Sequence, residues 1–261
     1  MTASRRQTPG PTWIGPFSSW DDAVSSREFG REPGSGSLFG LKSWLDRQEA
    51  FLLRVIKECG QPGAECTLGR ASNLPVLAAL SDVPLRILDL GGGSAWIAEH
   101  LYLMHLQIRE YLVIDVPEVC ERFARGRRSG ISYANLDLAA RQMLSGPWDI
   151  VYANSSMQYA PSNGFLLQLL QQTQPRVVLL DDLLTTPAED DVFALQLNSD
   201  VPEVVRFSSE TLLKRDLHAL GYRAKWSAPF IQPGFLNRAD STDAAKLPEL
   251  PQPRSLLFLR N

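Results

Sequence analysis

Residues 86–98 read Arg86-Ile-Leu-Asp-Leu-Gly-Gly-Gly-Ser-Ala-Trp-Ile-Ala98. An apolar run ends in an acid, a glycine cluster follows, and a helix-like pattern begins directly after it. This order predicts a strand, a tight turn and a helix N-terminus, the local geometry in which nucleotide-like cofactors bind. Glycine residues in the turn let a ligand approach the backbone closely. A tight turn that binds no ligand is the alternative.

The acid in this stretch distinguishes between cofactors. Asp89 stands two residues before Gly91, where its negative charge would repel a pyrophosphate. It suits a cofactor with cationic groups, and S-adenosylmethionine carries an ammonium and a sulfonium. A nicotinamide cofactor, the oxidoreductase alternative, fits less well because Trp96 stands where its fingerprint needs glycine or alanine. Tyr222 and Lys225 are also one residue too close for a short-chain dehydrogenase pair.

Composition excludes several classes of protein. The chain has 261 residues, 44% hydrophobic content and a formal net charge of -3, so a nucleic-acid partner is not expected. No apolar run approaches the ~18 residues of a membrane helix. No secretory apolar segment follows the basic residues near the N-terminus. We therefore predict a cytoplasmic protein without nucleic-acid or membrane partners.

The three cysteines show no metal-binding spacing. Cys59 and Cys66 are too far apart for a CxxC pair, and no histidine lies nearby. We predict no metal site and reduced thiols at Cys59, Cys66 and Cys120.

Strands and helices alternate beyond residue 84. Seven apolar segments are predicted as strands: 85–90, 110–115, 130–134, 148–153, 176–181, 222–226 and 255–259. Helical patterns lie between most of them. This alternation predicts an α/β fold, a Rossmann-like, seven-stranded and mostly parallel sheet with helices on both faces. Ligands bind such sheets at the carboxyl ends of the strands, where the strand order reverses.

The chain divides into two predicted regions. Residues 1–83 form an N-terminal helical extension that covers the substrate site, with helices expected over 18–25, 38–59 and 73–80. The helix over 38–59 either covers the site or pairs two subunits in a homodimer. Residues 84–261 form the cofactor-binding domain, which contains a lid-like insertion at about 185–207 because that connection is long.

Polar residues follow the predicted strand ends. Asp115 closes the second strand and suits the two ribose hydroxyls, since an ionised carboxylate only accepts hydrogen bonds. Asp137, with its adjacent backbone, follows the third strand and would meet the adenine amino edge. Each of these acids has an alternative role as a helix cap. The loop 154–159, Asn-Ser-Ser-Met-Gln-Tyr, follows the fourth strand, and its polar side chains point toward the transferred group.

In the order and spacing of these motifs the chain resembles the class I S-adenosylmethionine-dependent methyltransferases, over about residues 84–260. The Asp-x-Gly-Gly-Gly form at 89–93 and the Asp-x-Pro-x-Val form at 115–119 are most similar to bacterial small-molecule O-methyltransferases. Phe17-Ser-Ser-Trp-Asp-Asp-Ala23, Ser156-Met-Gln-Tyr159, Gln196 and Phe207-Ser208 are similar to a family of methyltransferase-like proteins. Genes of that family often accompany surface-polysaccharide or specialised-metabolite pathways.

The resemblance implies methylation, mainly at oxygen, of a small hydroxylated metabolite or an activated sugar. It implies that Asp89 and the glycines hold the methionine moiety, Asp115 the ribose and Asp137 the adenine. The full predicted cofactor set is Asp89, Gly91, Gly92, Gly93, Asp115, Val116, Leu136, Asp137 and Asn154. Gln158 and Gln196 are the predicted substrate contacts. The loop at 154–157 lacks the Asn/Asp-Pro-Pro-aromatic motif of nucleic-acid base methyltransferases.

A histidine base, typical of the better-known O-methyltransferases, is not evident. All three histidines fall in predicted helices away from the strand ends: His100, His105 and His218. No metal pair is formed by the first two, because residues five apart do not share a helical face.

The remaining candidates for a general base are Asp181, Asp182 and Tyr159. Adjacent carboxylates at a strand end raise each other's pKa, which favours a base, although they are equally suited to capping the next segment. A third option needs no strong base, because alignment of the reactants alone contributes up to roughly 7–11 kcal/mol. A binding module that keeps this fold without catalysis is a further alternative.

Overall fold

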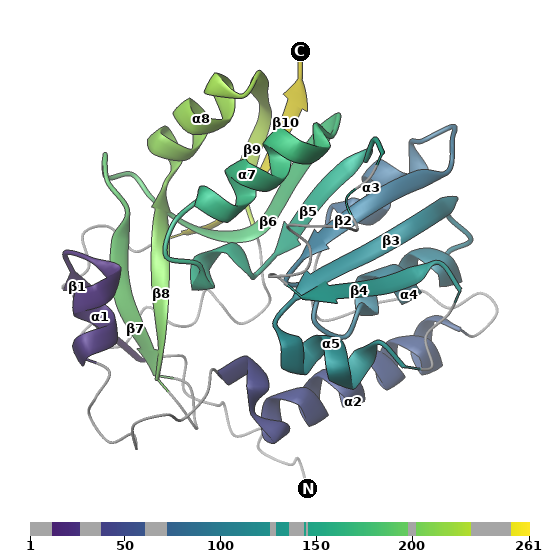
Figure 1. Ribbon diagram of the computed structural model, residues 1–261, viewed down its shortest axis with the longest axis horizontal. Coiled ribbons are helices and arrows are strands. Elements are labelled where there is room, and N and C mark those ends of the chain that lie inside the picture. The colour runs from purple at the N-terminus through teal and green to yellow at the C-terminus, as the bar shows by residue number, and fades with distance from the viewer. Residues whose placement is uncertain are drawn as a thin grey trace, which may run out of the picture.

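The computed structural model describes residues 12–26, 38–60, 72–125, 129–135, 144, 146–197, 202–230 and 252–261. These residues form one sheet of ten strands with helices packed on it (Figure 1). The strands are β1 (Thr12–Phe17), β2 (Leu85–Leu90), β3 (Ile108–Asp115), β4 (Ile131–Asn135), β5 (Ile150–Asn154), β6 (Val177–Thr186), β7 (Val192–Leu197), β8 (Pro202–Ser209), β9 (Tyr222–Pro229) and β10 (Gln252–Arg260). The helices are α1 (Trp20–Ser26), α2 (Lys42–Cys59), α3 (Leu74–Ala79), α4 (Trp96–Leu103), α5 (Pro117–Phe123), α7 (Gly164–Thr173) and α8 (Glu210–Ala219), with 3-10 turns η1 (Leu38–Gly40) and η2 (Met157–Tyr159).

The middle of the sheet follows the order β4-β3-β2-β5-β6-β10-β9. The strands from β4 to β6 are mutually parallel, and β10 is antiparallel to both of its neighbours. All seven strands expected from the sequence lie in this part. The chain builds outward from β2 to β4 and then returns to add β5 and β6, so the strand order reverses between β2 and β5. Sheets of this kind bind ligands at that point.

Three further strands extend the sheet beyond the seven expected. Strands β7 and β8 form an antiparallel hairpin, β1 pairs with β7, and β8 joins the end of β6 at residues 185–186. The segment at about 185–207, expected as a lid-like insertion, is mostly paired strand in its described residues. Its alternating apolar residues, such as Ala194, Leu195, Val204 and Val205, are buried on the two faces of the hairpin.

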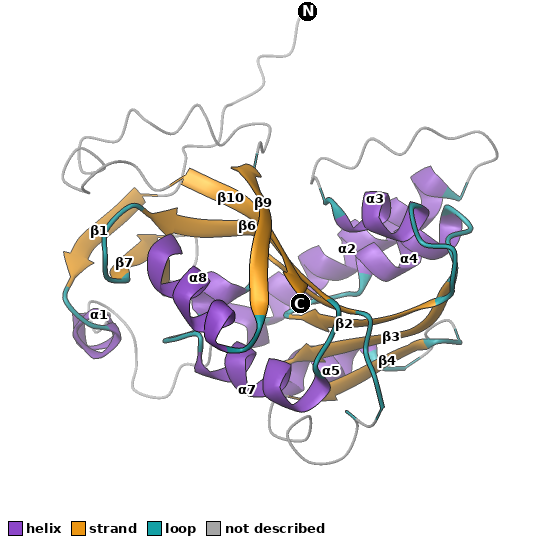
Figure 2. Cartoon of the chain, turned by 90° about the horizontal axis from the view of Figure 1, so that it is seen from above, coloured by secondary structure: helices purple, strands orange, loops and turns teal. Residues whose placement is uncertain are grey.

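Side chains alternate across the middle strands and form two cores. Leu88, Leu112 and Val151 pack on one face with α7 and α8, whereas Ile87 and Tyr111 pack on the other with α2, α3 and α4. Figure 2 shows these two helical layers on either side of the sheet. Burying both faces of the parallel strands explains their nearly continuous apolar sequences.

The N-terminal region is only partly helical. Helices α1, α2 and α3 lie close to the expected ranges, but residues 12–17 form the strand β1 rather than part of a helical extension. Helix α2 packs against α4 through Leu52 and Val55, which are both buried. Within the described ranges, no helix combines the length and the apolar character needed to cross a bilayer.

One cysteine differs from the expectation of reduced thiols. Cys59, the last residue of α2, is disulfide-bonded, whereas Cys120 is a free thiol. Cys66 lies outside the described residues. Cysteines without metal-binding spacing can still form a disulfide.

Candidate functional site

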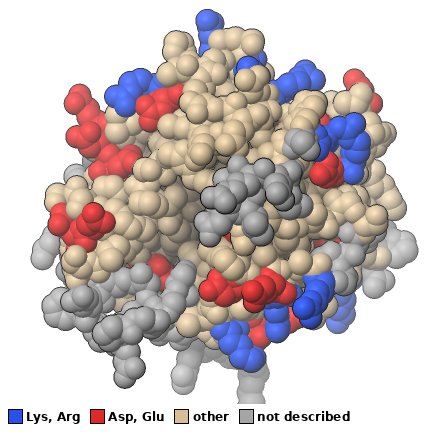
Figure 3. Space-filling model, viewed as in Figure 1, with Lys and Arg blue, Asp and Glu red and all other residues tan. Residues whose placement is uncertain are grey.

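A cavity of about 450 Å³ lies at the carboxyl ends of β2, β3 and β5. This is the point at which the strand order reverses. Its walls also include residues of α1, η1, α2, η2 and β8. A cavity of this size is in the range of sites for small molecules and cofactors. On the face shown in Figure 3, basic and acidic side chains of the described residues are interspersed, and no broad basic surface is visible.

The glycine turn lines the cavity with bare backbone. Gly91 and Gly93 have φ angles of +69° and +57°, a region that side chains rarely adopt. A Cβ atom on Gly92 would overlap the Asp89 carboxylate, and one on Gly91 would overlap Ser156. The turn therefore requires glycine, and it exposes peptide groups to whatever occupies the cavity.

Asp89 faces the cavity at the end of β2. Its side chain is buried, and Oδ2 accepts a hydrogen bond of 2.6 Å from the Tyr111 hydroxyl. Burial raises the pKa of Asp89 to about 7, although the bond from Tyr111 opposes that rise. A cation bound beside it would favour the ionised carboxylate.

Asp115 lies at the end of the adjacent strand β3. Its Oδ2 accepts a hydrogen bond of 2.9 Å from the Gly93 amide, and Oδ1 accepts one of 2.7 Å from the Val116 amide. Burial raises the pKa of Asp115 to about 6, whereas the two backbone bonds lower it. The carboxylate makes no capping bond to the first turn of α5, so the alternative role as a helix cap is not what the structure shows. Val116 also lines the cavity.

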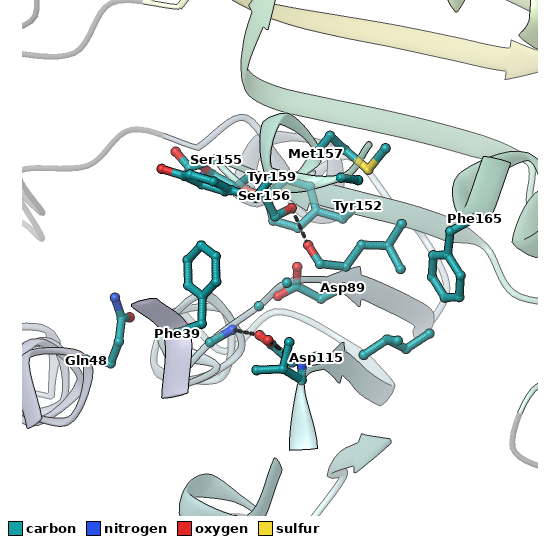
Figure 4. Close-up of a pocket in the computed structure, with 18 of the residues that line it drawn as sticks. Phe39, Gln48, Asp89, Asp115, Tyr152, Ser155, Ser156, Met157, Tyr159 and Phe165 are labelled. Carbon is teal, nitrogen blue, oxygen red and sulfur yellow. Dashed lines mark hydrogen bonds between the residues drawn. The ribbon is translucent and has the colours of Figure 1, made fainter. Parts of the chain in front are cut away.

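The loop after β5 supplies a polar wall. Asn154 lines the cavity and donates a hydrogen bond of 2.7 Å to the Tyr152 hydroxyl. Ser156 Oγ donates to the Leu90 carbonyl at 2.5 Å, which fixes the loop against β2. Figure 4 shows Asp89 and Asp115 pointing into the same cavity as Phe39 and Tyr159.

Two predicted substrate contacts lie behind this wall. Gln158 is buried, is not among the lining residues, and its Oε1 atom has no hydrogen-bond partner within the described part of the chain. Gln196, on β7, is not a lining residue either, but its Oε1 accepts a hydrogen bond of 3.3 Å from the Tyr159 hydroxyl. Gln196 is therefore connected to the cavity through the Tyr159 hydroxyl.

The predicted catalytic pair is not brought to the cavity. Asp181 accepts two hydrogen bonds of 2.7 Å from Asn73, one from the backbone amide and one from the side chain. Asp182 has a φ of +50° and accepts a hydrogen bond from Ser155. The two acids oppose a single residue, Ser255, at an irregularity in the pairing of β6 with β10. From the sequence, Asp181 and Asp182 were expected at the end of a strand, whereas β6 continues past both acids to Thr186.

Tyr159 is the one predicted catalytic residue that reaches the cavity. The structure also adds residues that were not among the predicted site residues. Phe39 packs edge-to-face on Trp44 and Tyr159, with ring centroids 5.2 and 4.9 Å apart, and Trp20 and Glu203 complete this wall. No local motif marks Phe39, Trp44 or Glu203, whereas Trp20 belongs to the family-like stretch at residues 17–23.

Two predicted cofactor residues, Leu136 and Asp137, lie outside the described residues. The remaining ones, Asp89, Gly91, Gly92, Gly93, Asp115, Val116 and Asn154, all line the one cavity.

The sheet order, the reversal beside the glycine turn and the acids near adjacent strand ends define a Rossmann-like α/β fold with a ligand site at the reversal. No protein-family model and no curated protein sequence matches the chain. Solved structures match at the level of the fold. The CcbJ methyltransferase of Streptomyces caelestis is 13% identical over 79% of this chain and 95% of that chain, with a TM-score of 0.50.

A second solved structure has a different chemistry. The [4+2]-cyclase SpnF is 16% identical over 82% of this chain and 94% of its own chain, with a TM-score of 0.52. A methyltransferase and a cyclase thus share the architecture of this protein. Similarity to these solved structures shows the fold, whereas the reaction depends on the residues of the site.

Proposed function

We propose that the protein is an S-adenosylmethionine-dependent methyltransferase that acts on a small molecule. The observation that carries this proposal is the pair of buried acids, Asp89 and Asp115, which face one cavity beside a bare glycine turn. Buried carboxylates are stabilised by cationic or hydrogen-bond-donating partners. The ammonium, sulfonium and ribose hydroxyls of S-adenosylmethionine supply both kinds.

Each part of this cofactor has proposed contacts among the residues that line the cavity. Asp89 and the glycine turn would hold the methionine moiety, and Asp115 would accept hydrogen bonds from the ribose. Asn154 and the Val116 backbone would complete the site, with Leu136 and Asp137 proposed for the adenine. The cofactor supplies an activated methyl group, and the protein supplies alignment of that group with the acceptor.

The proposed acceptor atom is a hydroxyl oxygen of a small metabolite or activated sugar, in line with the family resemblance. Tyr159 is the candidate that can touch the acceptor, because its ring lines the cavity and its hydroxyl is oriented by Gln196. Asp181 and Asp182 would act only through other residues, since neither lines the cavity. Asp181 is held by Asn73, and Asp182 accepts a hydrogen bond from Ser155, which does line it. The N-terminal segments would cover the acceptor through Trp20, Phe39 and Trp44.

Calorimetry with S-adenosylmethionine and S-adenosylhomocysteine tests the cofactor half of the proposal. We expect binding of both, and no heat at millimolar ligand would overturn it. Transfer of a labelled methyl group to fractionated metabolites tests the reaction. Cofactor binding without any methyl transfer would instead favour the non-catalytic binding module.

A homodimer through the N-terminal helices is also proposed. Leu53 and Ile56 lie one turn apart on α2 and are 60% and 40% exposed, so they offer an apolar face that a second copy of the chain could cover. Light scattering after gel filtration should report a dimer, and the double substitution Leu53→Glu with Ile56→Glu should give a monomer. A monomeric wild-type protein would contradict this.

The cytoplasmic location stays a prediction. Disulfides are rare in that compartment, so the bonded state of Cys59 bears against it. Alkylation of thiols in intact cells, followed by mass spectrometry, would test the prediction. An alkylated Cys59 would agree with the cytoplasm, and a protected one would contradict it.

A further inference from the structure

We propose that the acceptor is a small aromatic compound whose flat ring binds against four aromatic side chains of the cavity. The proposal rests on the proposed methyltransferase function and names the substrate class of that site. The four side chains form the aromatic wall, which we define as Trp20, Phe39, Trp44 and Tyr159. They belong to α1, η1, α2 and η2, and the fold brings these separate segments to one cavity.

Aromatic residues are concentrated in the described lining of this cavity. Seven of its 24 residues are aromatic, whereas aromatic residues make up 9% of the chain. Three of the six tryptophans of the chain are among them, Trp20, Trp44 and Trp96. Core packing accounts for Trp96 and Tyr152, which are buried, but the four residues of the aromatic wall are only half-buried. Their apolar surface therefore faces the cavity, where a ligand can cover it.

Edge-to-face packing holds the rings of the aromatic wall. Phe39 packs on Trp44, with ring planes 89° apart, and on Tyr159, with planes 72° apart (Figure 4). Trp20 packs in the same manner on Phe193 of β7, with ring centroids 6.2 Å apart. Because their neighbours already hold these rings, a ligand ring can pack on them without first ordering them.

The aromatic wall adjoins the proposed methionine site. A Cβ atom on Gly93 would lie 3.8 Å from the Trp44 ring and 3.3 Å from Oε1 of Gln48, which is one turn further along α2. A Cβ atom on Gly91 would overlap Ser156, which directly precedes η2. Both α2 and the segment of η2 thus lie against the glycine turn. A ring bound on the aromatic wall is therefore close to the proposed methyl donor.

An activated sugar fits the aromatic wall less well. Two polar side chains at this end of the cavity already bond within the protein, since the Tyr159 hydroxyl donates to Gln196 and Glu203 Oε1 accepts from the Leu38 amide. A sugar brings several hydroxyls, and each one that is buried without a partner costs free energy. An aromatic ring needs no partners beyond those of the hydroxyl that is methylated, and its apolar area favours burial.

The test uses matched probes on protein saturated with S-adenosylhomocysteine. 2-Naphthol and decahydro-2-naphthol share a carbon skeleton and a hydroxyl, but only the first has flat aromatic rings. Uridine diphosphate glucose represents an activated sugar. Calorimetry should show 2-naphthol binding at least about 10-fold tighter than either of the other two. Equal or tighter binding of the saturated alcohol or the sugar would overturn the proposal. So would an absence of 2-naphthol binding at millimolar concentration.

A pair of matched substitutions locates the ring. Trp44→Leu removes an aromatic face from the cavity and should weaken 2-naphthol binding about 10-fold, the scale of one aromatic contact, while affecting the saturated alcohol less. The control Trp226→Leu removes a 41% exposed indole of β9 that does not line the cavity, and it should change neither affinity. Unchanged 2-naphthol affinity in a folded Trp44→Leu protein would refute the role of the aromatic wall. If that variant fails to fold, Trp20→Leu takes its place with the same expectation.

The proposed function can fail separately. If S-adenosylhomocysteine does not bind, the methyltransferase proposal falls, and the same probes are then titrated into the free protein. A preference for 2-naphthol there would keep the aromatic-ring site, and a lack of preference would remove it as well.

Discussion

The backbone amide of Gly93 donates a hydrogen bond of 2.9 Å to Oδ2 of Asp115, which ties the turn after β2 to the end of β3. Oδ1 of the same carboxylate is held by the Val116 amide. Two motifs that lie 22 residues apart in the chain are thus joined through one side chain. The acid proposed for the ribose also fixes the backbone proposed for the methionine moiety.

Asp115→Asn should weaken binding of S-adenosylhomocysteine by about 10- to 100-fold. The amide keeps one acceptor oxygen but loses the charge, and a charge-assisted hydrogen bond contributes about 1.5–3 kcal/mol. Calorimetry measures the change. Asp149→Asn is the control, because Asp149 also accepts a backbone bond, from Arg86, but does not line the cavity. Equal losses in the two variants would contradict the role of Asp115.

Asp89 should make cofactor binding depend on pH. Its pKa is about 7 in the free protein, so it is largely protonated at pH 6. Binding a cation favours the ionised form and releases the proton. Affinity for S-adenosylmethionine should therefore rise between about pH 5.5 and 7.5 and then level off. Calorimetry in buffers of different ionisation enthalpy measures the number of protons released on binding. The Asp89→Asn substitution should abolish this release. A flat pH profile in the wild type would refute this.

The same group should lower stability at neutral pH. Because its folded pKa lies above the unfolded value of about 4, Asp89 stabilises the fold below pH 4, and that contribution is lost as pH rises to 7. At pH 8 the free energy of unfolding of Asp89→Asn, measured with urea, should therefore be roughly 1–3 kcal/mol higher than that of the wild type. At pH 4 the two proteins should be similar. A less stable variant at pH 8 would contradict the raised pKa.

The cofactor half of the site was predictable because its signals are local. A strand, a turn and a helix N-terminus follow one another over residues 86–98. Asp115 is the last residue of its strand, and Asp89 is the last but one of its strand. The sequence pattern also predicted the seven strands of the middle sheet, since most of them contain a nearly continuous apolar run. The helical patterns between these strands correspond to α4, α5 and α7.

The acceptor half depends on pairing between distant residues. Gln196 faces Glu203 only because β7 and β8 form a hairpin, and Phe39 meets Tyr159 across 120 residues of sequence. Asp181 was read as a strand end, but its partner Asn73 lies 108 residues away. Neither periodicity nor spacing contains such information, so these roles could be assigned only from the structure.

Gly92→Ala should reduce affinity for S-adenosylhomocysteine by about 10-fold or more. The added methyl would overlap the Asp89 carboxylate, which must then move or lose its place in the cavity. Overpacking of this kind costs about 1–3 kcal/mol. Gly164→Ala is the control at the start of α7, where the new methyl meets only the flexible Ser162 hydroxyl. If both variants bound equally well, the close packing of the turn would be irrelevant to the ligand.

Asp181→Ala should mainly affect stability. It leaves two donors of Asn73 without their acceptor, and each such loss costs about 1–3 kcal/mol. We expect a loss of roughly 2–4 kcal/mol in urea unfolding and unchanged affinity for S-adenosylhomocysteine. Asn73→Ala should cost less when Asp181 is already absent. A stable Asp181→Ala protein with lost turnover would restore the catalytic prediction for this acid.

Arg206 connects the hairpin to the loop that carries Tyr159. Its guanidinium is fully buried, lies 3.0 Å from Asp191 and donates a hydrogen bond of 3.3 Å to the Met157 carbonyl. Arg206→Met should destabilise the protein by about 3–5 kcal/mol, because the Asp191 charge loses its partner. Asp191→Asn combined with Arg206→Met should cost less than the sum of the two single changes, by about 1–3 kcal/mol. Urea unfolding of the four proteins measures this coupling. Strict additivity would mean that the ion pair contributes nothing to stability, and the loss would then have to come from packing of the arginine stem and from its bond to Met157.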